Sequence, residues 1–312
     1  MGPGSLGTGS YGPLGLVAVC WLLAKTQRFC AVSLRDRGPI PEEAGPRWFV
    51  YHSTTVSFVE ITTPRRRVWP APIDTDLTTV CLETLEAELR RIYGEYDWVY
   101  DLLAEQKNVG RLRGRMPVMT GTVGAEDAVV KRLWHGGSTA ELWKDRFLST
   151  RRVRSFVTAT EYLLDRGVHT PLLLFASWRR LHGTIRSELG FERIEGKDAD
   201  HFFFERSEPP SDWEGESRKV GELVASLHRV GFVHGDLNLM NVFLRTDGTV
   251  FILDLDKARH HDEELDDLTR ERNLARLGRS IRKQGRDHPA EYVGAIIRLA
   301  REGYLERVES EK

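Results

Sequence analysis

Apolar residues recur along this chain with two different periods, and the change from one to the other predicts a mixture of helices and strands. Residues 48–63 are dense in β-branched and aromatic residues, which predicts one or two strands. In residues 77–107 the apolar residues instead recur at helical spacing, which predicts a helix. The helical repeat consists of Leu82, Leu85, Leu89 and Ile92.

The middle of the chain predicts a strand pair, a helix and further strands, in that order. Residues 111–121 and 128–134 form the strand pair, with a turn at residues 122–127 between them. A helix follows at residues 156–167, where Gly167 is the signal of a helix C-terminus. Strand-like runs come next, at residues 172–176, 189–194 and 201–206.

The C-terminal part of the chain is predicted to contain two helical regions with a β-hairpin between them. Residues 214–231 predict an amphipathic helix, and the tail from Asp262 onward is helical and heavily charged. The apolar runs 242–244 and 250–253 flank a turn at Asp247-Gly248, which is the pattern of a hairpin. The buried face of the first helix is predicted to consist of Val220, Leu223, Val224 and Leu227.

Composition narrows the class of protein. Hydrophobic residues make up 40% of the chain and charged residues 29%, which excludes a disordered, collagen-like or coiled-coil protein. The net charge of -1 gives no global basic field, so we expect no nucleic-acid partner. The cysteines, at positions 20, 30 and 81, are too few and too scattered for a disulfide framework.

The N-terminal segment differs in composition from the rest of the chain. Residues 1–46 are rich in Gly, Pro and Ser at both ends and are expected to form a poorly ordered leader. The longest apolar run, residues 14–24, is about half the length that spans a bilayer, and no Lys or Arg precedes it. We therefore expect a cytoplasmic chain without a signal peptide or a transmembrane span.

Three polar residues flank the predicted hairpin. Asp236 and Asn241 lie five positions apart just before its first strand, and Asp254 follows its second strand. Because the hairpin folds back on itself, Asn241 and Asp254 are expected at adjacent strand ends. A carboxylate beside an amide oxygen suits a hard cation such as Mg²⁺, and Asp236 is left as a separate carboxylate nearby.

These residues resemble the motifs of the protein-kinase-like fold, in which H-R-D-L-x-x-x-N supplies the base and one metal ligand and D-F-G supplies another ligand. This chain has His234-Gly235-Asp236-Leu237 with Asn241, and then Asp254-Leu255-Asp256. The resemblance implies an α+β, bilobal fold with a small β-rich N-lobe and a larger helical C-lobe. It also implies that Asp236 is the catalytic base and that Asn241 and Asp254 bind Mg²⁺. The H-G-D form resembles kinases of small molecules and sugars.

The same resemblance implies where ATP is held. Residues 128–131 resemble the V-A-I-K strand, so Lys131 is expected to contact the phosphates and Glu161 to pair with Lys131. Gly114 lies where the glycine-rich loop belongs, although its surroundings do not form a G-x-G-x-x-G motif. Backbone groups around Glu192 and Ile194, at the hinge between the lobes, are expected to hold the adenine.

Several segments resemble the lipopolysaccharide kinases that phosphorylate Kdo (3-deoxy-D-manno-octulosonic acid) or a core heptose attached to lipid A. They are residues 131–137, 161–171, 191–194 and 273–280, and the last of these points to the Kdo kinase branch. The resemblance implies ATP and Mg²⁺ as cofactors, a Kdo-bearing lipid A precursor as acceptor, and peripheral contact with the cytoplasmic face of the inner membrane. The densest basic cluster either binds the acceptor or forms a solvated face, and consists of Arg146, Arg151, Arg152 and Arg154.

The expected organisation has four parts, and two alternative functions stay open. The parts are the leader 1–46, an extension of unknown role at 47–108, the N-lobe with the hinge at 109–194, and the C-lobe at 195–312. One alternative is another small-molecule kinase, or a small ancient protein kinase, of the same fold, which a substrate panel would identify. The other is a nucleotide-binding pseudokinase module. A binding module that takes no nucleotide would not be stabilised by Mg-ATP against heat.

Overall fold

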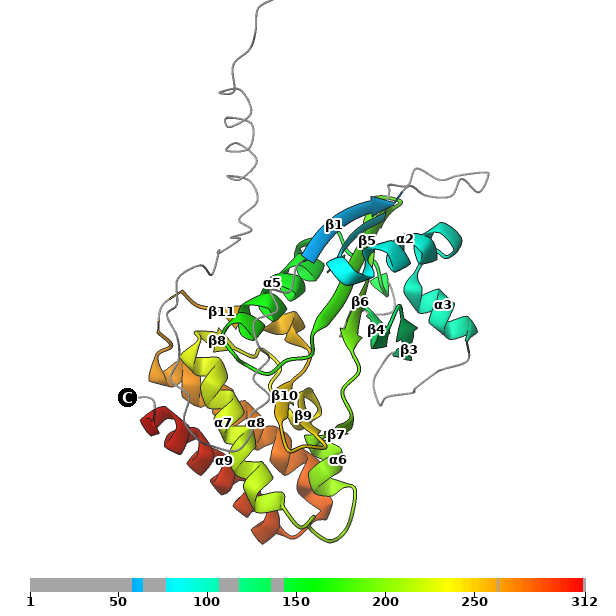
Figure 1. The fold of residues 1–312 in the computed structure, drawn as a ribbon. Helices are drawn as coiled ribbons and strands as arrows, with labels where there is room; N and C mark the ends of the chain where they lie inside the picture. The colour runs from blue at the N-terminus through cyan, green and yellow to red at the C-terminus, as the bar shows by residue number, and fades with distance from the viewer. Residues whose placement is uncertain (1–57, 64–76, 107–117, 136–142, 263, 311–312) are drawn as a thin grey trace, which may run out of the picture. The chain divides into compact units, whose positions relative to one another are not determined.

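The computed structural model describes residues 58–63, 77–106, 118–135, 143–262 and 264–310 (Figure 1). The contacts divide the chain into two units, Met1–Thr54 and Thr55–Lys312, and every described residue belongs to the second. The leader predicted over residues 1–46 therefore lies outside the described residues.

Strands alternate with helices in the first part of the described chain, and helices dominate the rest. The first part contains β1 (Phe58–Thr63), β2 (Leu77–Leu82), α2 (Glu86–Glu95), α3 (Val99–Glu105), β3 (Met119–Val123), β4 (Glu126–Arg132), α5 (Arg151–Asp165), β5 (Leu173–Leu181) and β6 (Thr184–Glu192). The second part contains β7 (Gly196–Asp198), α6 (Ala199–Phe204), α7 (Trp213–Arg229), β8 (Phe232–Val233), β9 (Val242–Arg245), β10 (Val250–Ile252), β11 (Arg259–His260), α8 (Asp267–Gln284) and α9 (Ala290–Ser310). The protein is therefore of the α+β class, as predicted.

A six-stranded antiparallel sheet is the main feature of the first part, with the order β1-β2-β5-β6-β4-β3. The predicted strand pair is present as β3 and β4, whose turn contains Gly124 at φ +64°. Strands β1 and β2 come from the predicted extension at residues 47–108, and β2 pairs with β5. The described strands of that extension thus belong to the same sheet as the strands of the predicted N-lobe.

Helices cover both faces of this sheet (Figure 1). On one face, Leu89 of α2 and Leu103 of α3 belong to a buried cluster with Val130 of β4. On the other face, α5 contributes Phe156 and Val157 to the larger core, which continues into α7 and α8. The apolar residues of neighbouring strand positions are divided between the two cores because successive side chains of a strand point to opposite faces.

Two of the secondary-structure predictions are wrong in part of their range. The predicted helix at 77–107 begins with strand β2, because β-branched Thr78, Thr79 and Val80 favour a strand and pair with β5. The strand-like run at 201–206 falls mostly in helix α6, whose first turn is capped by Asp198, which accepts a hydrogen bond from the His201 amide (2.8 Å).

The predicted helix at 214–231 is confirmed as α7, and all four residues of its predicted buried face are buried. Helix α7 packs closely against α9, since a Cβ at Gly221 would lie 1.8 Å from the Ala300 carbonyl oxygen. The predicted hairpin is confirmed as β9 and β10, with Val242 opposite Ile252. None of the helices in the described ranges is long and apolar enough to cross a membrane.

Candidate active site

The loop after β8 carries the first predicted motif and is fixed by a buried histidine. His234 is buried, and its Nδ1 accepts a hydrogen bond from the Asp236 amide (3.2 Å). Its Nε2 therefore carries the proton and donates to the Leu253 carbonyl (2.9 Å). Burial lowers the pKa of His234 and keeps the ring neutral. The role of His234 is therefore structural: its two hydrogen bonds tie the loop to Leu253, the residue after β10.

Two amide side chains hold the loop around Asp236. The Nδ2 atoms of Asn238 and Asn241 each donate to the Asp236 carbonyl, both at 2.8 Å. The Asp236 carboxylate takes no part in these contacts and its side chain is 44% exposed, so a small molecule can reach it. The buried Oδ1 of Asn238 has no hydrogen-bond partner among the described residues.

Asn241 and Asp254 lie at adjacent strand ends, as the hairpin predicts. The Leu253 amide donates to the Asn241 carbonyl (2.8 Å), which extends the hairpin pairing to the residue before Asp254. Asp254 has a left-handed backbone, with φ 54° and ψ 67°, which aspartate tolerates better than most residues. Such a conformation is typical of functional sites, because it persists only where the surroundings impose it.

Lys131 of β4 reaches Asp254, and this contact joins the sheet to the hairpin. The Lys131 Nζ lies 2.9 Å from the Asp254 Oδ1, and 4.9 Å from the ring centre of Phe156. Burial would raise the pKa of Asp254, but the charge and hydrogen bond of Lys131 outweigh it and hold the pKa below its usual value. Asp254 is therefore ionised at neutral pH, as a metal ligand must be.

Glu161 does not make the expected pair with Lys131 among the described contacts. Burial, and secondly the charge of Asp165, raises the pKa of Glu161 to about 7. A nearby ammonium group would lower that pKa instead. The residue of α5 that contacts the Lys131 ammonium is Phe156, through its ring.

The link between α5 and the hairpin loop comes from Arg152, a member of the basic cluster predicted to bind the acceptor or to form a solvated face. The Arg152 guanidinium contacts both carboxylate oxygens of Asp256 and donates to the Trp134 carbonyl (2.9 Å). Of the predicted basic cluster, Arg154 lies over the Trp178 ring (4.8 Å), while Arg146 and Arg151 are exposed. No local signal identifies the Arg152–Asp256 pair, because its members are 104 positions apart.

Among the predicted nucleotide-binding residues, the hinge is described and the glycine-rich loop is not. The amides of Glu192 and Arg193 donate to the carbonyls of Leu172 (2.9 Å) and Asp127 (2.8 Å). The Ile194 amide donates to no group in the described ranges. Gly114 lies outside the described residues.

The donor set at the hairpin fits a magnesium ion. The Asn241 amide nitrogen is used within the loop, which leaves its oxygen available. Asp254 binds Lys131 through Oδ1, and its other oxygen accepts no hydrogen bond from the described residues. An amide oxygen and an ionised carboxylate at adjacent strand ends are oxygen ligands of the kind that Mg²⁺ prefers.

Side chains of helix α8 hold the loop that carries Asp236 through two hydrogen bonds. The Asn273 side chain donates to the His234 carbonyl (2.9 Å), and the Ser280 hydroxyl accepts from the Leu239 amide (3.1 Å). His228 of α7 lies 3.0 Å from Asn273 Oδ1 and 3.0 Å from the Tyr304 hydroxyl of α9. Buried polar contacts thus connect α7, α8 and α9 to the loop that carries Asp236.

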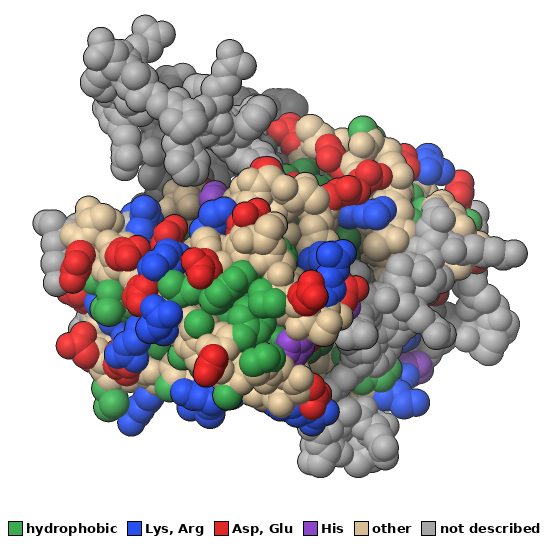
Figure 2. Space-filling view, turned by 90° about the horizontal axis from the view of Figure 1, so that it is seen from below, with side chains coloured by type: hydrophobic (Ala, Val, Ile, Leu, Met, Phe, Trp, Pro, Cys, Tyr) green, Lys and Arg blue, Asp and Glu red, His purple; other side chains and the backbone are tan. Residues whose placement is uncertain are grey.

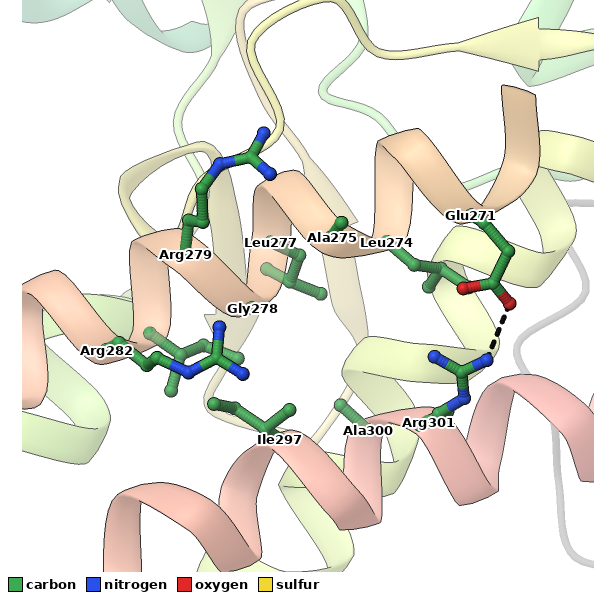
Figure 3. Close-up of a pocket in the computed structure, with 11 residues that line it drawn as sticks. Glu271, Leu274, Ala275, Leu277, Gly278, Arg279, Arg282, Ile297, Ala300 and Arg301 are labelled. Carbon is green, nitrogen blue, oxygen red and sulfur yellow. Dashed lines mark hydrogen bonds and ion pairs between the residues drawn. The ribbon is translucent and has the colours of Figure 1, made fainter. Parts of the chain in front are cut away.

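A groove of about 240 Å³ lies between α8 and α9 (Figure 3). Leu274 and Ile297 contribute apolar walls, and Arg279 and Arg282 stand beside it on α8. The Arg301 guanidinium closes one end through its 2.6 Å ion pair with Glu271. Figure 2 shows a face of the molecule on which apolar side chains gather and charged side chains surround them.

Comparison with known proteins identifies one family. The chain matches the lipopolysaccharide kinase (Kdo/WaaP) family over residues 102–293. It is similar to a 3-deoxy-D-manno-octulosonic acid kinase of Xylella fastidiosa (strain M12), with 32% identity over 162 residues, 50% of this chain and 62% of the relative. The enzyme of that name from Vibrio parahaemolyticus is 30% identical over 184 residues, 57% of this chain and 74% of the relative. The chain thus covers less than two thirds of the Xylella protein's length.

Proposed function

The chain belongs to the lipopolysaccharide kinase (Kdo/WaaP) family, and we propose that it transfers the γ-phosphoryl group of ATP to a Kdo hydroxyl of a lipid A-linked precursor. The observation that carries this proposal is the contact of Lys131 with Asp254, 123 positions apart in the sequence and joined at 2.9 Å. This contact supports the proposal because phosphoryl transfer requires a phosphate-binding cation beside a metal-binding carboxylate, the roles proposed for Lys131 and Asp254.

In this reaction Asp236 is the base. The acceptor hydroxyl gives its proton to the Asp236 carboxylate, and its oxygen forms a bond to the γ-phosphorus. The bond between that phosphorus and the β-phosphate oxygen breaks, and ADP leaves. The partial exposure of Asp236 supports this role because the acceptor must reach it from solvent.

Asn241 and Asp254 would hold Mg²⁺, which neutralises phosphate charge when it is bound. Lys131 would contact the phosphate oxygens, and its pairing with Asp254 sets it beside the proposed metal ligands. Most of the acceleration would come from positioning and from charge neutralisation. The Ile194 amide, which donates to no group among the described residues, supports the proposal that the hinge holds the adenine. Gly114 remains the proposed loop glycine.

We propose that the chain is bilobal, with the N-lobe and hinge at residues 109–194, the C-lobe at 195–312 and an N-terminal extension at 47–108. The distribution of elements supports the boundary between the two lobes, since the main sheet ends with β6 at Glu192 and the long helices follow. The leader at 1–46 stays a prediction. Glu161 stays a candidate for the nucleotide site on the basis of the resemblance alone.

The acceptor is proposed to be bound at the membrane surface, on the cytoplasmic face of the inner membrane. Residues 272–283 of α8 carry five cationic side chains and no acidic one. They are Arg272, Arg276, Arg279, Arg282 and Lys283, all exposed. Arg276, Arg279 and Arg282 form no ion pair with a described acidic residue, so they are available to the phosphates of lipids. Each such charge contributes about 1 kcal/mol to the free energy of binding to an anionic membrane surface. The same helix supports the Asp236 loop through Asn273.

An acceptor panel tests the proposed function. The protein is incubated with γ-labelled Mg-ATP and, separately, a Kdo-bearing lipid A precursor, a heptose-bearing core, an aminoglycoside and a general protein substrate. Label on the Kdo acceptor is expected. Label only on the aminoglycoside or the protein would assign the chain to another kinase class. No label, together with thermal stabilisation by Mg-ATP, would favour a nucleotide-binding pseudokinase, and no label without that stabilisation would favour a binding module that takes no nucleotide.

A further inference from the structure

Asp236 has a cationic partner of its own, which the sequence motifs do not contain. The Lys257 Nζ lies 3.1 Å from the Asp236 Oδ2. Across the site, the Lys131 Nζ lies 2.9 Å from the Asp254 Oδ1. Each of the two carboxylates proposed to act in the transfer is therefore paired with a different lysine.

The backbone at Lys257 packs closely against the loop that carries Asp236. A Cβ at Gly235 would lie 2.1 Å from the Lys257 carbonyl oxygen and 3.0 Å from the Lys257 Cβ. Only glycine allows that approach, so the absence of a side chain at residue 235 brings Lys257 to its position beside Asp236. Two residues away, Val233 of β8 pairs with Arg259 of β11, and this pairing fixes the register of the segment with Gly235 against the segment with Lys257.

Stability does not account for this arrangement. The Lys257 side chain is 65% exposed, and an ion pair in such surroundings contributes little to the free energy of folding. An ammonium group has three donors and no acceptor, so it can bind an anionic oxygen while it still contacts Asp236. The anionic oxygens that come closest to the base during the proposed reaction are those of the transferred phosphoryl group.

We propose that Lys257 is a second catalytic residue that donates a hydrogen bond to an oxygen of the phosphoryl group while it passes from ATP to the acceptor. This inference rests on the proposed phosphoryl transfer. The bonds that form and break are those given above, and Lys257 keeps its proton throughout. Its effect is greatest in the transition state, where the moving group lies between the leaving oxygen and the hydroxyl beside Asp236.

The test compares Lys257→Met, Lys257→Arg and a control, Lys219→Met. Lys219, whose side chain is 43% exposed, also forms an ion pair, with Glu216 at 2.8 Å, but it lies on α7. Two quantities are measured: kcat for transfer to a detergent-dispersed Kdo-bearing lipid A precursor, and the affinities for Mg-ADP with and without aluminium fluoride. The fluoride complex imitates the phosphoryl group in transfer and needs no acceptor.

Lys257→Met is expected to lower kcat by about 10²-fold, the usual effect of losing one such donor. It should also lose the extra affinity that aluminium fluoride gives to Mg-ADP, while Mg-ADP alone binds within about threefold of the wild type. Lys257→Arg should retain part of both effects, and Lys219→Met all of both. Unchanged kcat and unchanged fluoride affinity in Lys257→Met would overturn the proposal. So would an equal loss of affinity for Mg-ADP and for its fluoride complex.

The two measurements separate this proposal from the proposed function. If the wild type labels no Kdo acceptor but binds the fluoride complex tightly, the acceptor assignment fails. The fluoride affinity of Lys257→Met then decides the role of Lys257. If the wild type neither transfers phosphate nor distinguishes the fluoride complex from Mg-ADP, both proposals fail together.

Discussion

Arg152, in the first turn of α5, contacts both carboxylate oxygens of Asp256, two positions after Asp254. The same guanidinium donates to the Trp134 carbonyl, just beyond β4 and Lys131. One side chain thus joins the helix, the strand that carries the lysine and the loop that carries the proposed metal ligand. A two-point contact fixes orientation as well as distance, because the guanidinium and the carboxylate are both planar.

We expect Arg152→Met to lower kcat by about 10²-fold, since small misplacements of reacting groups have effects of that size. Arg152→Lys should give an intermediate kcat, because lysine keeps the charge but cannot make the two-point contact. A double-mutant cycle with Asp256→Ala measures the coupling, which should be about 1–3 kcal/mol in the free energy of activation. Additive effects of the two substitutions would mean that the pair does not position Asp254.

Asp236→Ala and Asp254→Ala should each lower kcat by about 10²-fold or more while the protein stays folded. Their side chains are 44% and 47% exposed, so their removal opens no buried cavity. The matched control is Asp262→Ala, whose side chain is 99% exposed. Thermal unfolding and steady-state kinetics are measured for all three variants. Near-normal activity of Asp236→Ala would show that it is not the base.

Acid should destabilise the protein through His228. Burial lowers its pKa to about 4, although the hydrogen bond with Asn273 opposes the shift. The folded form thus binds a proton less readily than the unfolded chain, whose histidine pKa is near 6.5. The stability is complete above pH 6.5 and falls by roughly 3 kcal/mol as the pH drops to about 4.

Urea unfolding of wild type and His228→Gln between pH 4 and pH 8 checks this expectation. Glutamine does not titrate, so the difference in unfolding free energy between the two proteins should shrink as the pH falls. A difference that stays constant with pH would show that His228 has the same pKa in both states.

Reversal of charge on α8 should weaken binding to anionic vesicles. Arg276→Glu combined with Arg279→Glu should reduce the binding constant for phosphatidylglycerol-containing vesicles by about tenfold or more. The control, Arg90→Glu with Arg91→Glu on α2, makes the same change in net charge at side chains that are 48% and 58% exposed. Equal losses in both variants would place the contact elsewhere.

The elements that the sequence predicts best are those whose local pattern agrees with their packing. Helix α7 and the hairpin of β9 and β10 have a clear period and a clear turn, and both are present. The sequence pattern does not predict strand β2, because its Leu82 also fits the helical repeat that continues into α2. Its pairing with β5, far along the chain, decides its structure, and no local pattern contains that contact.

In the candidate site, too, the sequence predicts the contacts that a local pattern contains and misses those between distant segments. The spacing of Asn241 and Asp254 predicts their neighbouring positions, because a hairpin joins them. The charge of Glu161 and its position on a helix predict it as the partner of Lys131, but neither specifies which face of that helix is turned to the site. Residues 152 and 156 of α5 lie one turn apart, and both face the site through Asp256 and Lys131. Position 160 continues that row and is a buried threonine, and Glu161 lies one residue further round the helix.

The central claim is tested most directly by transfer of labelled γ-phosphate from Mg-ATP to a Kdo-bearing lipid A precursor, with Asp236→Ala as the blank. We predict label on the lipid with the wild type and its loss, by about 10²-fold or more, with the variant. Equal labelling by both proteins, or none by a wild type that binds Mg-ATP, would contradict the account.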